Sequence, residues 1–217
     1  MKKLIGLFMS LATCALLLVP VFAQGSSHTV TAEDVMDNIN LGYKVEYVRV
    51  SDLGDESAEV SINRQLEESA RDSMLLAISQ SNVMTYSDSR ATGEYHQSVT
   101  RQTKDLISVK TSRDFSVGEH KIYSDKSGQV FDAQTGAKLR LSELFNNSSD
   151  YLKIVKNEMK TLVNQPLDVD DECSFYLTDT ELVLVCKQGE EDSQDLRAYE
   201  VPIALTDLQD VLKPQYR

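Results

Sequence analysis

The chain has 217 residues, with 22 Lys and Arg against 34 Asp and Glu, and a formal net charge of −12. Hydrophobic residues make up 41% of the sequence and charged residues 26%, enough apolar material for a folded core, which excludes wholesale disorder. This length suits one domain of moderate size or two small ones. The acidic balance argues against nucleic acid as a partner, because neutralising phosphates requires clustered Lys and Arg.

Residues 1–23 have the pattern of a secretory signal peptide. Lys2 and Lys3 form a positive start, a long apolar run follows, and Val21–Ala23 is a small-residue exit. A membrane anchor is the alternative, because the run is almost long enough to span a bilayer. The exit and the short basic start favour cleavage and export, to a periplasm or the extracellular space, with no membrane span afterwards. Cleavage removes two Lys and no acidic residue, so the net charge falls from −12 to −14.

The N-terminal part of the remaining chain predicts a linker, a strand and a long helix. Residues 24–42 read as a polar linker followed by a short helix that Gly42 ends, and residues 43–50 alternate as a strand. Over residues 58–79 apolar residues recur at every fourth position, which predicts the longest helix, with one buried stripe and a charged outer face. The stripe is Ile62, Leu66, Ala70, Met74 and Ala77 or Ile78.

Strands dominate the rest of the chain. Turns are expected at Asp125–Gly128 and Ala133–Gly136, and helices over about 149–165 and 206–213. Because helices alternate with runs of strands and not as strict βαβα units, we predict an α+β fold, in which a twisted, mainly antiparallel sheet packs against two main helices in a single domain over 43–217. The expected strands are 93–101, 105–113, 117–124, 129–132, 173–178, 181–187 and 198–204.

Two cysteines flank a predicted hairpin. If Asp179 and Thr180 form a two-residue loop, Thr178 faces Glu181, and counting outward places Cys173 opposite Cys186 in a non-hydrogen-bonded pair. Their Cα atoms would then lie about 4.5 Å apart, close enough for a disulfide. Free thiols or a redox pair are the alternatives, and the expected export favours the disulfide.

Motifs of catalytic and metal sites are missing from the sequence. The three histidines, His28, His96 and His120, stand in no ligand spacing, and no nucleophile elbow or phosphate loop occurs. We therefore predict no catalytic residue, no metal and no cofactor. Acidic runs over 168–172 and 190–192 lack the ligand order of a calcium loop and are expected to be solvated. A pair of carboxylates acting on a glycoside stays open, because sequence does not show their separation.

Three stretches together resemble a known family. They are Ser61–Leu66 at the head of the long helix, Asp105–His120, and above all Val130–Phe145, with Phe-Asp-x-x-Thr-Gly-x-x-Leu-x-Leu-x-x-Leu-Phe as its core. Their order resembles the extracellular domain of RsiV-type anti-sigma factors, which is similar to the N-terminal module of PdaC-type peptidoglycan deacetylases. The resemblance implies an α+β fold with a twisted sheet and a binding or sensing role at the cell envelope.

The expected function follows from that resemblance. The RsiV ectodomain is a lysozyme receptor, and the PdaC chemistry lies in a separate domain, so the resemblance implies a non-enzymatic protein that binds lysozyme or peptidoglycan. The sequence keeps only part of the family's Gly-Gly-Ala-His-Gly loop, at Gly118–Lys121. The candidate ligand loop is Gly118, Glu119, His120 and Asp125. A metal-dependent or carboxylate-based hydrolase of cell-wall material, built on His96 and His120, is the alternative. The oligomeric state is left open.

Overall fold

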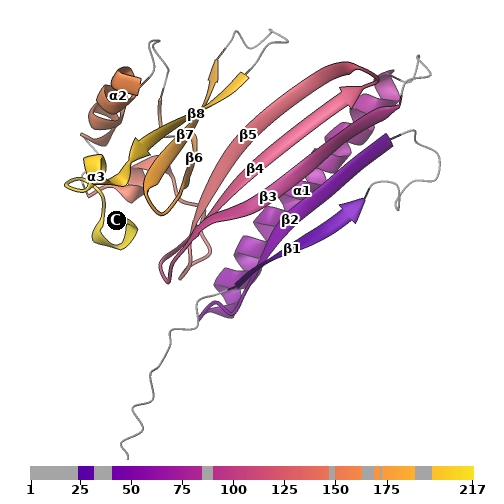
Figure 1. Cartoon of the computed structure of the whole chain (residues 1–217). Coiled ribbons are helices and arrows are strands. Elements are labelled where there is room, and N and C mark those ends of the chain that lie inside the picture. Colours follow the sequence, from indigo (N-terminus) through magenta and orange to yellow (C-terminus); the bar gives the residue numbers. More distant parts are fainter. Residues whose placement is uncertain are drawn as a thin grey trace, which may run out of the picture.

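The computed structural model describes residues 24–31, 41–84, 90–146, 150–162, 169–171, 173–188 and 197–217. The expected signal peptide, the short helix over 31–39 apart from its first residue, and the acidic run over 190–192 lie outside these residues. The fold is α+β and forms a single domain, as the sequence predicts. It has two β-sheets, one long helix and several short helical segments (Figure 1).

The larger sheet has the strand order β1-β2-β3-β4-β5. Neighbouring strands are antiparallel except β2 and β3, which run parallel because a helix connects them. The segment expected as a polar linker begins instead with β1, which pairs with β2 from Gln24 opposite Ser51 to Thr31 opposite Lys44. The strands are β1 (Gln24–Thr31), β2 (Leu41–Ser51), β3 (Ala91–Gln102), β4 (Leu106–Val117) and β5 (His120–Asp132).

Helix α1 (Glu56–Met84) lies along one face of this sheet (Figure 1). Asp55 caps it, because its Oδ1 accepts the N–H groups of Ser57 and Ala58 at 2.7 and 3.1 Å. The predicted stripe is buried at all of its positions but one. Met74 is only half-buried, and the adjacent Ser73 is buried in its place, where it hydrogen-bonds the Tyr43 hydroxyl at 2.8 Å.

The second layer is a smaller antiparallel sheet covered by helical segments. Its strands are β6 (Ser174–Leu177), β7 (Glu181–Gln188) and β8 (Arg197–Ala204). Around it lie α2 (Tyr151–Leu162), α3 (Leu205–Leu208) and the 3₁₀ segments η2 (Leu141–Leu144) and η3 (Pro214–Tyr216). Together they enclose the largest apolar cluster, which includes Phe175, Leu177, Leu182, Leu184, Ile203 and Leu208.

Polar groups join the two layers. On the face of the larger sheet opposite α1, the Ser108 hydroxyl accepts the Leu177 N–H at 2.8 Å, and Thr100 donates to the Leu177 carbonyl at 2.7 Å. Gly128 lies directly against β6, where an added Cβ would come within 2.2 Å of the Phe175 carbonyl oxygen. Glu200 of β8 pairs with Lys126 and with Lys110, the latter at 2.6 Å. The smaller sheet therefore covers one end of that face.

The turn predicted at Asp125–Gly128 does not exist. β5 runs without interruption from His120 to Asp132, and Asp125 lies in its middle, opposite Arg113 of β4. Its Gly128 serves the close approach of β6 and not a turn. The turn predicted at Ala133–Gly136 is confirmed.

Candidate functional site

The largest described groove lies between α1 and the exposed half of β4 and β5, with a volume of about 680 Å³. Helix α1 packs mainly over β2, so the β4–β5 side of the same sheet face is left partly open (Figure 1). Hydroxyls, amides and charged groups make up most of the lining. It includes Glu68, Ser69 and Asp72 of α1, Thr111 and Arg113 of β4, Asp125, Ser127 and Gln129 of β5, and Lys138.

A buried chain of hydrogen bonds fixes the floor of this groove. The Tyr95 hydroxyl donates to Ser69 at 2.9 Å and accepts from the Gln97 amide at 2.6 Å, and Gln97 in turn accepts the Val48 N–H at 3.0 Å. Burial raises the pKa of Tyr95, so its hydroxyl stays protonated at neutral pH. The chain links β2, β3 and α1, and it holds the groove floor in one geometry.

Arg113 and Asp125 form the charged centre of the groove. Arg113 Nη2 lies 2.6 Å from Asp125 Oδ2, and the Arg113 guanidinium also lies over the Tyr123 ring at 5.4 Å. Both side chains come from neighbouring strands and point to the α1 side of the sheet, because Arg113 and Asp125 are opposite residues. The pair neutralises itself, so it offers hydrogen bonds more than net charge.

A smaller groove of about 190 Å³ adjoins the larger one. Gln129 and Lys138 line both, so the two grooves meet at these residues. The smaller groove continues past Arg140, Asp171 and Cys173. We call Gln129 and Lys138, together with the neighbouring Arg140 of the smaller groove, the junction.

Asp171 in the smaller groove has a structural role. Its carboxylate accepts the Ser142 N–H at 2.7 Å, the Ser142 hydroxyl at 2.9 Å and the Tyr151 hydroxyl at 3.1 Å. Burial raises the pKa of Asp171, but these bonds outweigh it and the pKa is lowered overall. Asp171 therefore fixes the start of η2 to α2, and it is not the solvated loop residue that the sequence predicts.

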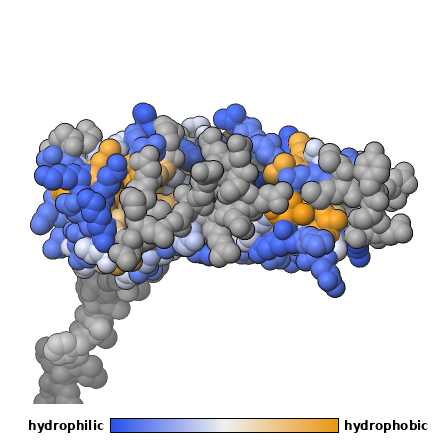
Figure 2. Space-filling view, turned by 90° about the horizontal axis from the view of Figure 1, so that it is seen from above, coloured by the Kyte–Doolittle hydropathy of each residue, from blue (hydrophilic) through white to orange (hydrophobic). Residues whose placement is uncertain are grey.

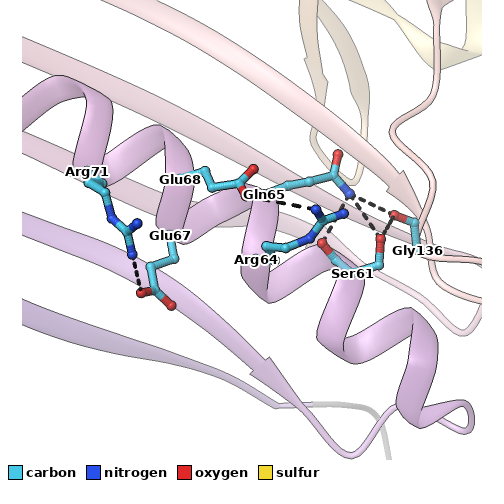
Figure 3. Close-up of polar contacts among 7 residues, drawn as sticks. All are labelled: Ser61, Arg64, Gln65, Glu67, Glu68, Arg71 and Gly136. Carbon is cyan, nitrogen blue, oxygen red and sulfur yellow. Dashed lines mark hydrogen bonds and ion pairs between the residues drawn. The ribbon is translucent and has the colours of Figure 1, made fainter.

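A third groove, of about 430 Å³, lies on the other flank of α1, along β2. Its α1 wall carries paired charges: Arg71 lies 3.3 Å from Glu67, and Arg64 lies 3.9 Å from Glu68. Figure 3 shows these pairs, and it shows Ser61 and Gln65 turned toward Gly136. Because these paired charges are exposed, each pair contributes little to stability.

The candidate ligand loop predicted from the sequence does not come together as a site. Gly118 and Glu119 form the exposed turn between β4 and β5, and His120 begins β5. Asp125 lies five residues further along, in the large groove. Sequence reasoning thus selected one groove residue, Asp125, and assigned it to a loop that is a strand.

His96 and His120 do not share a site. His96 of β3 lies opposite Ser112 of β4, and His120 lies opposite Val117, five residues along the same strand, which corresponds to about 17 Å. His96 pairs with Glu46 at 2.9 Å on the exposed face of the sheet. Hydrogen bonds from Lys44 and His96 lower the pKa of Glu46. Within the described ranges no three His, Cys, Asp or Glu side chains are grouped as metal ligands.

The predicted hairpin register of the cysteines is confirmed, and their bond is not formed in the structure. Ser174 lies opposite Val185 and Phe175 opposite Leu184, the register that places Cys173 opposite Cys186. Both are in the thiol form, Cys186 buried and Cys173 half-buried. Burial raises the pKa of Cys186 to about 11, so it is a poor nucleophile at neutral pH.

The motif that carries the family resemblance builds the fold. Asp132 Oδ1 accepts the N–H groups of Gln134 and Thr135 at 2.9 and 2.8 Å and closes the turn. Gly136 has φ +70° and lies against the first turns of α1, where Ser61 and Gln65 donate to its carbonyl at 3.3 and 3.0 Å (Figure 3). The motif joins β5 to α1.

The surface is mainly polar. Figure 2 shows mostly hydrophilic residues on the face seen from above, with apolar residues in separate areas. The large apolar side chains that are exposed in the described residues are spread over α1, α2 and β8: Val60, Leu75, Leu76, Leu162 and Tyr199. Among the helices described, none has the length and apolar character needed to cross a membrane.

Two solved structures are similar to this chain. One is a DUF3298-family protein from Pseudomonas aeruginosa PAO1, with a TM-score of 0.56 and 13% identity over 89% of this chain and 95% of the other. The second is a DUF3298-family member from Bacteroides fragilis, with a TM-score of 0.54 and 11% identity over 88% and 94%. DUF3298 is a domain found in RsiV-like proteins. At these identities the likeness shows the fold, and neither description names an activity.

No family model matches the chain, and no curated protein matches it. The two solved structures support the fold that the resemblance implies, and the specific relationship to RsiV-type and PdaC-type proteins stays a prediction.

Proposed function

We propose that this chain is an exported, non-catalytic binding protein of the bacterial cell envelope, and that its ligand is peptidoglycan. One observation carries the proposal: the largest described groove has a volume of about 680 Å³, is lined mainly by hydroxyls, amides and charged groups, and has a floor held by buried hydrogen bonds. Peptidoglycan offers hydroxyls, amides and carboxylates along an extended polymer, and such groups need many hydrogen bonds and few apolar contacts.

The chemistry of the groove favours binding over catalysis. Its carboxylates are Glu68 and Asp72 on α1 and Asp125 on β5; Asp125 is engaged by Arg113, and Glu68 lies 3.9 Å from Arg64. The two histidines of the hydrolase alternative stand on opposite sides of β4 and are offset by about 17 Å along it.

The direct test is retention on purified, protein-free cell wall. The mature protein is mixed with insoluble peptidoglycan, sedimented and quantified in the pellet. We expect retention, and we expect Thr111→Trp, which fills the groove floor, to abolish it. Ser112→Trp is the matched control, because it adds the same bulk to the opposite face of β4. Equal retention of both variants, or no retention of the parent protein, would refute the proposal.

Lysozyme is the second candidate, and the net charge favours it. Lysozymes are generally basic, and a protein with a net charge of −12, or −14 after leader cleavage, attracts a basic partner and speeds the encounter. Pull-down with lysozyme at low and high salt separates a specific complex from charge attraction. Binding that vanishes completely at about 0.5 M salt, where screening is strong, would count against a specific lysozyme receptor.

A further inference from the structure

The junction of the two grooves carries two positively charged side chains, although the chain as a whole has a net negative charge. The chain has a net charge of −12, yet Lys138 and Arg140 project together at this point. Leu139 between them is buried in the largest apolar cluster, beside the smaller sheet, and its N–H donates to the Val130 carbonyl at 2.7 Å. Because side chains alternate along an extended segment, Lys138 and Arg140 point to the same, outer side.

Neither cation is fully engaged. The Lys138 side chain is exposed and has no ion-pair partner among the residues that the structure describes. Arg140 lies 4.0 Å from both Glu143 and Asp171, the outer limit of an ion pair, and its side chain is 64% exposed. Both carboxylates already accept other hydrogen bonds. Asp171 accepts three, and Glu143 accepts the Arg140 N–H at 2.7 Å. Both cations can therefore turn toward an added anion.

An unsatisfied amide lies beside these cations. Gln129 lines both grooves, and its Oε1 is buried without a hydrogen-bond partner in the described part of the chain. Leaving a buried acceptor without a partner is unfavourable. Turning the Gln129 amide toward a ligand N–H would remove that penalty.

We propose that the junction binds the C-terminal carboxylate of a peptide. Lys138 and Arg140 pair with the carboxylate, and Gln129 accepts the N–H of the last peptide bond. The two interactions match a group of the form –NH–CHR–COO⁻, in which an amide donor and a carboxylate are separated by one carbon. The inference rests on the proposed function, because the peptide would be the stem peptide of peptidoglycan, whose chain ends in such a carboxylate.

The test compares two synthetic peptides on the mature protein by isothermal titration calorimetry. The probes are N-acetyl-Lys-Ala-Ala with a free carboxylate and the same peptide as its C-terminal amide. We expect the free acid to bind about tenfold more tightly, as the loss of one charge-assisted hydrogen bond implies. Replacing both cations, Lys138→Gln together with Arg140→Gln, should remove this preference, and Gln129→Met should weaken both peptides alike. Lys153→Gln, which removes an exposed cation from α2, should leave the preference intact.

Equal affinities for acid and amide, no binding of either, or a preference that survives the replacement of both Lys138 and Arg140 would overturn the inference. Each variant is also tested for retention on cell wall, which separates the two proposals. Retention without a carboxylate preference would keep the proposed function and reject the junction as a subsite. A carboxylate preference without retention would support the junction and reject peptidoglycan as the ligand. Thermal unfolding of each variant checks that the fold is intact.

Discussion

Gly136 lies where the turn after β5 packs against the first turns of α1. Its φ is +70°, and a Cβ would approach the Ala58 carbonyl oxygen to 2.6 Å. We therefore expect Gly136→Ala to lower the free energy of unfolding by about 2 kcal/mol, from backbone strain together with a clash against backbone atoms. Urea denaturation measures it. Gly54→Ala is the control, because nothing lies within 4 Å of the added Cβ, and a loss equal to that of Gly136→Ala would contradict the prediction.

Glu200 gives the protein an acid-sensitive contact. Burial raises the pKa of its carboxyl, but the bonds from Lys110, Lys126 and Tyr176 outweigh burial and hold the pKa at about 2. The pKa of Glu200 in the folded protein lies below its ordinary value of 4.5. The ionised carboxylate therefore stabilises the fold fully above about pH 4.5, and this stabilisation is lost as the pH falls toward 2. We expect Glu200→Gln to cost about 2 kcal/mol at pH 7 and much less at pH 3.

The measurement is urea unfolding of the parent protein and Glu200→Gln at both pH values. Asp210→Asn is the control, since Asp210 is an exposed residue without a described ion pair. A Glu200→Gln effect of the same size at pH 7 and pH 3 would show that the carboxylate charge does not supply the stability.

At the scale of elements, the β6–β7 hairpin carries the clearest test of a sequence prediction. Cys173 and Cys186 are opposite residues by register, and they are thiols in the structure. In protein exported to an oxidising compartment we expect a disulfide, with two hydrogen atoms lost to a disulfide-exchange oxidant. Intact mass should be lower by two hydrogens than after reduction, and reduction should cost about 2–3 kcal/mol of stability.

Cys186→Ser serves as the control for that bond, because it removes the partner and keeps a residue of similar size. Its mass should not change on reduction, and reduction should not lower its stability. Two reactive thiols in the unreduced exported protein would contradict the prediction.

The elements that the sequence predicts well are those with a strong period. The 3.6-residue period of α1 and the two-residue loop at Asp179–Thr180 fix a helix and a hairpin register with few alternatives. The error at Asp125–Gly128 has a specific cause. Lys, Ser and Gly in succession resemble a turn, whereas here Lys126 binds Glu200 and Gly128 admits the backbone of β6. These are contacts with strands of the smaller sheet, 74 residues later for Lys126 and 46 residues later for Gly128, which local patterns do not contain.

The candidate site was missed for a related reason. Its groove residues come from α1, β4, β5 and the segment after β5, and no short motif joins them. Lys138 and Arg140 stand within the family-like string, at variable positions on either side of Leu139. The one available signal was the pair of cations one residue apart in an acidic chain. Their convergence with Gln129 depends on the bridge between Phe131 and Lys138, a tertiary contact.

At the scale of the whole molecule, two apolar cores lie on opposite faces of one sheet and are joined through polar contacts. α1 covers one face, the smaller sheet covers part of the other, and Ser108, Thr100 and Gly128 meet the backbone of β6 between them. Each side has its own cluster of buried apolar residues, so each layer has its own core. The cooperativity of unfolding then depends on how closely the layers approach at Gly128.

Gly128→Ala tests that dependence. The added Cβ would lie 2.2 to 2.7 Å from three backbone atoms of β6, which cannot move without displacing the smaller sheet. We expect the parent protein to unfold in one transition, and the variant in two, with the smaller-sheet layer unfolding first. Hydrogen exchange followed by mass spectrometry assigns each step, because amides of β7 should lose protection before those of β3 and β4. A single transition in Gly128→Ala, with unchanged protection of β7, would show that the two layers do not depend on this contact.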